Sequence, residues 1–102
     1  MQRTTAALLA LTVLCAAGPL RADDTGRNLA AACASCHGPE GVSRGGIPSL
    51  AGKNAAELIR AMQEFRDGRR PSTVMQQLAR GYSDEDVSLI AAWLAARKPE
   101  HP

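Results

Sequence analysis

The sequence predicts a single small all-α domain. Apolar residues recur at the three- and four-residue spacing of a helix in residues 51–67 and again in residues 84–97. No stretch sustains the two-residue alternation that indicates a strand, and no segment of the sequence is repeated. The length of 102 residues suits one domain.

The start of the chain has the pattern of a secretory signal. Arg3 supplies the positive charge, an apolar run covers residues 6–17, and Ala22 is the small residue before the expected cut. The run is too short to span a bilayer comfortably, so an uncleaved membrane anchor is the less favoured alternative. We therefore predict a signal peptide over residues 1–22, a mature domain over residues 23–102, export to the periplasm and no stable membrane anchor.

The charge of the mature domain gives no support to a nucleic-acid partner. The formal net charge of +2 comes from two arginines of the leader, and the remainder carries as many basic as acidic residues. Binding to nucleic acid requires a basic excess, which is absent. A domain this small also buries little apolar surface and commonly needs a disulfide or a metal to stabilise it.

The first helix is predicted over residues 26–33, with Asp24 or Thr25 as its N-cap. The second is predicted over residues 51–67, and Gly68 is placed to end it. Three arginines cluster at that end, where cations suit the helix dipole: Arg66, Arg69 and Arg70. We interpret them as a solvated surface cluster, and a docking patch is the alternative.

The rest of the chain predicts two further helices. A short helical piece covers residues 76–80 and is closed by Gly81. Ser83 then provides an N-cap before an acidic first turn. The last helix is expected to run to about Arg97, before Pro99 stops it.

Five consecutive residues read Cys-Ala-Ser-Cys-His and end at His37, which is the C-x-x-C-H attachment motif of a c-type haem. The thiols of Cys33 and Cys36 are spaced to form thioethers with the two vinyl groups of one porphyrin, and His37 then lies under the iron. A zinc site would need a second pair of ligands, but the other Cys and His are Cys15, in the leader, and His101. We predict one covalent haem c; a short-loop disulfide with an incidental His is the alternative.

The residues alone leave four candidates for the sixth ligand of the iron: Met62, Met75, His101 and solvent. Met62 lies on an apolar stripe, where Met is usually core filler, and His101 is in the C-terminal tail. We favour Met75, which is far enough past His37 for the chain to wrap to the other haem face. An imidazole and a thioether together favour electron transfer, because no axial site remains for a substrate. An open iron, as in a peroxidase or sensor, requires that Met75 does not bind.

The segment between the motif and the second helix is a loop by composition, and Pro48 lies within it. A backbone carbonyl near this proline could accept the proton on the free ring nitrogen of His37 and so orient the ring. An ordinary loop proline is the alternative.

Taken together, these features resemble the class I cytochromes c over nearly the whole mature chain. The matching pieces are Gly26, the C-x-x-C-H motif, residues 48–52, residues 65–68, Met75 and residues 82–86. The resemblance implies the small cytochrome c fold, with helices wrapped around one haem and with the first and last helices crossing where Gly26 meets Trp93. It also implies that the Pro48 carbonyl orients His37 and that Met75 is the second axial ligand.

A narrower resemblance concerns residues 72–83, which are similar to the monohaem cytochrome subunit of flavocytochrome c sulfide dehydrogenases. In that family the haem subunit accepts electrons from an FAD-containing subunit that oxidises sulfide. The resemblance implies a periplasmic electron-transfer subunit of a heterodimer, passing electrons to a downstream acceptor, with no catalysis by the chain alone. A free monohaem carrier that diffuses between respiratory or photosynthetic complexes is the alternative.

Overall fold

The structure is a computed structural model that describes residues 18–19 and 21–99. Within these residues every regular element is helical, so the all-α prediction is confirmed. The elements are, in order, α1 (Ala22–Ala30), η1 (Ala31–Cys33), α2 (Ala34–His37), η2 (Pro39–Gly41), α3 (Ala55–Arg66), α4 (Met75–Ala79) and α5 (Asp84–Ala95).

Most of the predicted leader lies outside the described residues, so residues 1–22 stay predicted as a signal peptide. Ala22, the residue before the expected cut, is the first residue of α1. None of the helices in the described ranges has the length and apolar character needed to cross a membrane.

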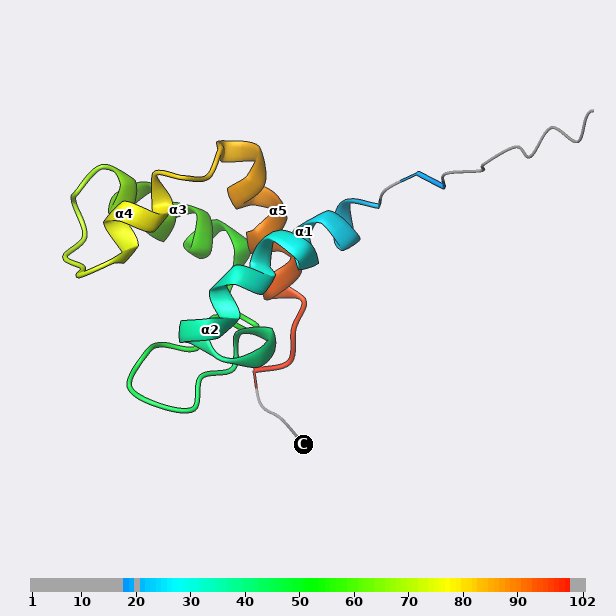
Figure 1. The fold of residues 1–102 in the computed structure, drawn as a ribbon, viewed down its shortest axis with the longest axis horizontal. Helices are drawn as coiled ribbons and strands as arrows, with labels where there is room; N and C mark the ends of the chain where they lie inside the picture. The colour runs from blue at the N-terminus through cyan, green and yellow to red at the C-terminus, as the bar shows by residue number, and fades with distance from the viewer. Residues whose placement is uncertain (1–17, 20, 100–102) are drawn as a thin grey trace, which may run out of the picture.

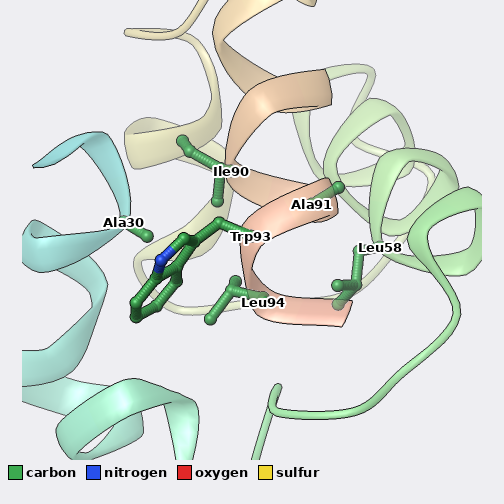
Figure 2. Packing of buried hydrophobic residues seen from close by; sticks show 6 residues of the cluster. All are labelled: Ala30, Leu58, Ile90, Ala91, Trp93 and Leu94. Carbon is green, nitrogen blue, oxygen red and sulfur yellow. The ribbon is translucent and has the colours of Figure 1, made fainter. Parts of the chain in front are cut away.

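α5 is the central helix of the fold. It packs against α1 on one side and α3 on the other, and α3 also packs against α4 (Figure 1). Figure 2 shows Trp93 of α5 beside Ala30 of α1, and Leu58 of α3 near Ala91 on the opposite side of α5. The apolar stripe predicted for the last helix is therefore its buried face.

The core is thin, as the composition predicts. Among the described residues nine hydrophobic side chains are buried, and four of them are alanines. Trp93 is the one aromatic side chain in this buried set, with 8% of its surface exposed. Alanine contributes little apolar area, so the polypeptide alone gains modest stabilisation from burial.

The first and last helices cross at Gly26, as the family resemblance implies. Gly26 is buried in α1. A Cβ atom added there would lie 2.6 Å from the Leu89 carbonyl oxygen and 3.1 Å from the Trp93 Cβ. Both contacts are with atoms on or next to the backbone of α5, so the two helices can approach this closely only because residue 26 lacks a side chain.

We expect Gly26→Ala to destabilise the protein. Ala has the better helix propensity by about 1 kcal/mol, but separating two packed helices to admit the Cβ costs about 1–3 kcal/mol and relaxes only partly. Denaturant unfolding should show a net loss of about 1–2 kcal/mol. Gly45→Ala is the matched control, because nothing lies within 4 Å of a Cβ there. Equal stability of the two variants would contradict this account of the crossing.

The first helix begins earlier than predicted. It begins at Ala22 instead of residue 26, and neither Asp24 nor Thr25 is its N-cap. The cap residue is Arg21, and the Thr25 hydroxyl and N–H both donate to the Arg21 carbonyl oxygen. The acidic residues of the first turn suit the positive end of the helix dipole, which favours the longer helix.

The second helix begins later than predicted, at Ala55 instead of residue 51. The reason is local: Asn54 caps the helix by accepting from the N–H groups of Ala56 and Glu57. Gly52 lies in the preceding turn with a φ of 72°.

The other end of α3 agrees with the prediction that Gly68 stops it. Gly68 has a φ of 74°, its N–H donates to Phe65 O, and the Arg69 N–H donates to Glu64 O. This pair of hydrogen bonds is a Schellman motif.

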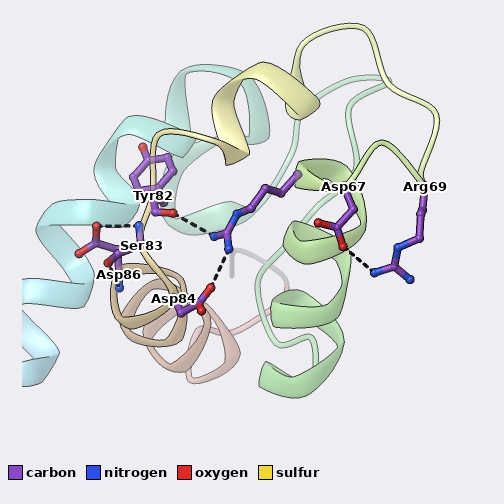
Figure 3. Close-up of polar contacts among 7 residues, drawn as sticks. Asp67, Arg69, Tyr82, Ser83, Asp84 and Asp86 are labelled. Atoms are coloured by element: carbon purple, nitrogen blue, oxygen red, sulfur yellow. Dashed lines mark hydrogen bonds and ion pairs between the residues drawn. The ribbon is translucent and has the colours of Figure 1, made fainter.

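The last two helices are close to their predicted positions. α4 begins at Met75, one residue before the predicted start. Ser83 caps α5 in a capping box with Asp86, as Figure 3 shows. α5 ends at Ala95, before the predicted Arg97, because the Arg97 N–H donates to Leu94 in a tighter final turn.

Candidate haem attachment site

The two cysteines of the motif lie on a helical continuation of α1. Cys33 ends η1 and Cys36 lies in α2, and neither forms a disulfide. Cys33 is half-buried against the hydrophobic core, whereas Cys36 is exposed. Burial raises the pKa of the Cys33 thiol, so the neutral thiol is the dominant form at neutral pH. The helical path places the cysteines nearly one turn apart, on neighbouring parts of one helix surface.

The His37 ring is held by one hydrogen bond. Its Nδ1 lies 2.6 Å from the Pro48 carbonyl oxygen. A carbonyl can only accept, so the neutral ring carries its proton on Nδ1 and donates it. The lone pair on Nε2 is then left for a metal ion, and the orientation of the ring is set by the backbone.

The loop between His37 and Pro48 is folded back by its own hydrogen bonds. The Gly38 N–H donates to Ala34 O and ends α2, and a Cβ at Gly38 would collide with the Val42 carbonyl. The N–H groups of Leu50 and Ala51 both donate to the Gly41 carbonyl oxygen, at 2.7 and 3.1 Å. These contacts return the chain to the motif and bring the Pro48 carbonyl to the histidine.

The two methionines considered as ligands are on different helices. Met75 begins α4 and Met62 lies within α3, and both are half-buried. Burial therefore does not distinguish them. His101, the remaining protein candidate, lies outside the described residues.

Large exposed apolar side chains lie next to Pro48 and near Met75 along the chain, which suits a large apolar cofactor. Three large hydrophobic side chains are notably exposed in the described part of the chain: Ile47 at 43%, Val74 at 57% and Leu78 at 50%. Ile47 precedes Pro48, and the other two flank Met75. A large apolar plate placed between the His37 and Met75 segments would give these side chains a partner.

The metal-binding side chains that are present also indicate a porphyrin. Within residues 18–19 and 21–99 no three residues among His, Cys, Asp and Glu are grouped so that they could hold a metal ion by themselves. One oriented imidazole with at most one thioether holds iron firmly only when a porphyrin supplies the other ligands.

Arg66 makes contacts that the sequence does not predict. The sequence predicts a solvated arginine cluster, but the Arg66 side chain is 28% exposed and contacts both Tyr82 and Asp84. The sequence offers no local signal for this, because both partners lie more than fifteen residues away along the chain.

Comparison with known proteins places the chain in a family. The model of the family described as cytochrome c oxidase, cbb3-type, subunit III matches residues 21–94. The chain is 41% identical over 71 residues to the cytochrome subunit of sulfide dehydrogenase from Chlorobaculum tepidum, which covers 70% of this chain and 64% of that protein. It is 38% identical over 94 residues to the thiosulfate dehydrogenase electron acceptor of Stutzerimonas stutzeri, covering 89% of this chain and 44% of that protein.

The fold has a solved counterpart. The crystal structure of reduced recombinant cytochrome c4 from Pseudomonas stutzeri aligns with a TM-score of 0.70 at 24% identity, covering 76% of this chain and 48% of that chain. The matched regions span 44% to 64% of the length of these proteins. The cofactor of such cytochromes is covalently bound haem c, so the predicted cofactor is confirmed. The sequence match, the helical fold and the intact attachment motif lead to one assignment: the chain belongs to the class I cytochrome c family.

Proposed function

We propose that the chain is a periplasmic electron-transfer cytochrome whose haem is attached through Cys33 and Cys36 and whose iron is held by His37 and Met75. The observation that carries the proposal is the 2.6 Å contact between His37 Nδ1 and the Pro48 carbonyl oxygen, beside two unpaired thiols. The haem supplies the reversible one-electron chemistry when it is bound, and the polypeptide orients it and sets its surroundings.

His37 serves as the proximal ligand in this proposal. The Pro48 carbonyl fixes its tautomer and keeps the Nε2 lone pair directed away from the loop. The hydrogen bond from Nδ1 to the carbonyl also makes Nε2 a stronger electron-pair donor to the metal. Carbonyl and carboxylate partners have this effect on metal-bound histidines in general.

Met75 serves as the second axial ligand. The Ser72 hydroxyl accepts from the Gln76 N–H at 3.0 Å, which fixes the first turn of α4 where Met75 lies. A soft thioether favours ferrous iron and raises the potential. With both axial positions filled by protein, no substrate reaches the iron, which favours electron transfer over peroxidase or sensor chemistry.

We further propose that the electron donor is an FAD-containing subunit that oxidises sulfide, joined to this chain in a heterodimer. Support comes from the identity with the cytochrome subunit of a sulfide dehydrogenase and from the similarity of residues 72–83. Sulfide oxidation releases two electrons to the flavin, and one haem accepts one. Each turnover therefore requires two successive transfers to the haem and on to a downstream acceptor.

A free carrier is the second candidate, and one observation favours it. The thiosulfate dehydrogenase electron acceptor matches a larger share of this chain than the sulfide dehydrogenase subunit does, at 89% against 70%. A carrier would present a small wet contact surface, whereas a subunit buries a larger apolar one.

Purification from the periplasmic fraction of the native host tests the partner. We expect a flavin absorbance beneath the haem bands, with added sulfide bleaching the flavin and reducing the haem. The equal numbers of acidic and basic residues after the leader predict that raised salt leaves the complex intact. A monomeric haem protein without flavin that sulfide does not reduce would support the free carrier, and haem protein found only in membranes would contradict export in soluble form.

A further inference from the structure

Arg66 joins two distant parts of the chain. It is the last residue of α3, and its Nη2 donates to the Tyr82 carbonyl oxygen at 2.9 Å, while Nη1 lies 2.7 Å from Asp84 Oδ1. Figure 3 shows the Tyr82 carbonyl and the Asp84 carboxylate converging on one guanidinium. These partners lie 16 and 18 residues further along the chain, and no other side-chain hydrogen bond among the described residues spans so far.

The segment closed by this contact carries Met75. It leaves α3 after Arg66, forms α4, and returns at Tyr82. Its second half is linked by backbone hydrogen bonds: Ala79 has no exposed surface, and the N–H groups of Gly81 and Tyr82 donate back into α4. The hydrogen bond to the Tyr82 carbonyl therefore adds to the packing of α4 on α3 in fixing where the end of α4 lies.

The first half of the segment is held separately. The Schellman motif at Gly68 turns the chain back on α3. Arg70 then pairs with Glu64 at 2.9 Å and lies over the Phe65 ring, with its guanidinium carbon 5.4 Å from the ring centroid. Both contacts are with the last turns of α3, so they hold the start of the segment. Its far end is held by the packing of α4 on α3 and by the two hydrogen bonds of Arg66.

We propose that Arg66 is a positioning residue that holds Met75 on the haem iron by bonding the far end of its segment to α3. We call its two contacts, with the Tyr82 carbonyl and the Asp84 carboxylate, the Arg66 clasp. The proposal rests on the proposed ligation by His37 and Met75. The iron–thioether bond is made by a half-buried residue at the start of a five-residue helix. Such a bond opens when the segment moves away as a unit, and the Arg66 clasp opposes that movement.

The two contacts of Arg66 differ in strength. The Asp84 side chain is 82% exposed, so this ion pair is screened by solvent and contributes little. The bond to the Tyr82 carbonyl is part-buried and charge-assisted, which makes it the stronger of the two. Removing the guanidinium should therefore matter much more than neutralising the carboxylate.

Imidazole binding to the ferric holoprotein measures how often Met75 leaves the iron. The apparent Kd for imidazole is inversely proportional to the open fraction. Arg66→Gln should lower this Kd about tenfold, which corresponds to about 1.4 kcal/mol. Arg69→Gln is the matched control, because it removes the same charge near the same helix end but breaks only an exposed pair with Asp67. It should leave the Kd unchanged, and Asp84→Asn should shift it by less than about threefold.

The same measurement in Met75→Ala distinguishes the positioning of Met75 from a general loosening of the protein. In Met75→Ala there is no thioether to displace, so adding Arg66→Gln should leave the Kd for imidazole unchanged. An equal tightening in that background, or an equal effect of Arg66→Gln and Arg69→Gln, overturns the clasp. If Arg66→Gln yields no holoprotein, Arg66→Met replaces it, because Met keeps an apolar stem of similar length and has no donor for either acceptor. An unchanged Kd in Arg66→Met overturns the clasp, and a lowered Kd supports it.

A failure of the proposed Met75 ligation and a failure of the clasp give different experimental results. Persistence of the near-infrared sulfur-to-iron band in Met75→Ala overturns both the ligation and the clasp. Loss of that band in Met75→Ala, with imidazole affinity indifferent to Arg66 in the otherwise unchanged protein, overturns the clasp alone.

Discussion

Cys33→Ser/Cys36→Ser should contain no covalently attached haem, whereas the unchanged protein should carry one haem on every chain. The reason is that a serine hydroxyl does not form the thioether to a porphyrin vinyl group. Intact mass spectrometry of the purified protein measures the difference directly, and extraction with acidified acetone should remove any haem from the double variant and none from the unchanged protein. Each single variant should keep one thioether.

The same double variant should also lose cooperative unfolding. The buried set in the described residues is rich in alanine, so the apolar porphyrin supplies a large part of the surface that folding buries. Ser35→Ala is the matched control, because Ser35 lies between the two cysteines and its hydroxyl contacts only the Ala32 carbonyl. Acid-resistant haem in the double variant, or extractable haem in the unchanged protein, would disprove attachment at these cysteines.

The helices were predictable where their signals are local. Gly68 and the capping box at Ser83 act through neighbouring backbone groups, and both act in the structure as the sequence predicts. Apolar periodicity continues upstream of Asn54 and predicts too early a start for α3, because the Asn54 cap decides where helical hydrogen bonding begins. Asp24 and Thr25 have the character of caps and predict too late a start for α1, because Arg21, which has no capping side chain, precedes the helix.

The site was predictable to the extent that it is contiguous. Cys33, Cys36 and His37 lie within one helical stretch, so their spacing alone predicts their chemistry. The contact between His37 and Pro48 depends on how an intervening loop closes: the residues suggested a carbonyl near Pro48, and the family resemblance named the Pro48 carbonyl itself. The partners of Arg66 depend on how α3 meets the start of α5, and no pattern in the sequence encodes that packing.

Met75→Leu should abolish the near-infrared sulfur-to-iron band of the ferric protein, and Met62→Leu should keep it. Leucine is used at both positions because it preserves the volume of methionine and removes only the sulfur, which limits packing losses to less than about 1.5 kcal/mol. The two methionines are similarly half-buried, so the pair of variants compares ligation at matched exposure.

The same substitution should lower the reduction potential. A thioether stabilises ferrous iron relative to ferric iron, and its loss leaves a harder ligand or solvent in its place. We expect a fall on the order of 0.1 V or more in Met75→Leu, within the roughly 0.8 V range that axial ligands span, and little change in Met62→Leu. Spectroelectrochemical titration measures both values. Loss of the band in Met62→Leu with its retention in Met75→Leu would move the ligand to α3. A band missing from the unchanged protein would exclude both methionines and leave His101 or solvent as the sixth ligand.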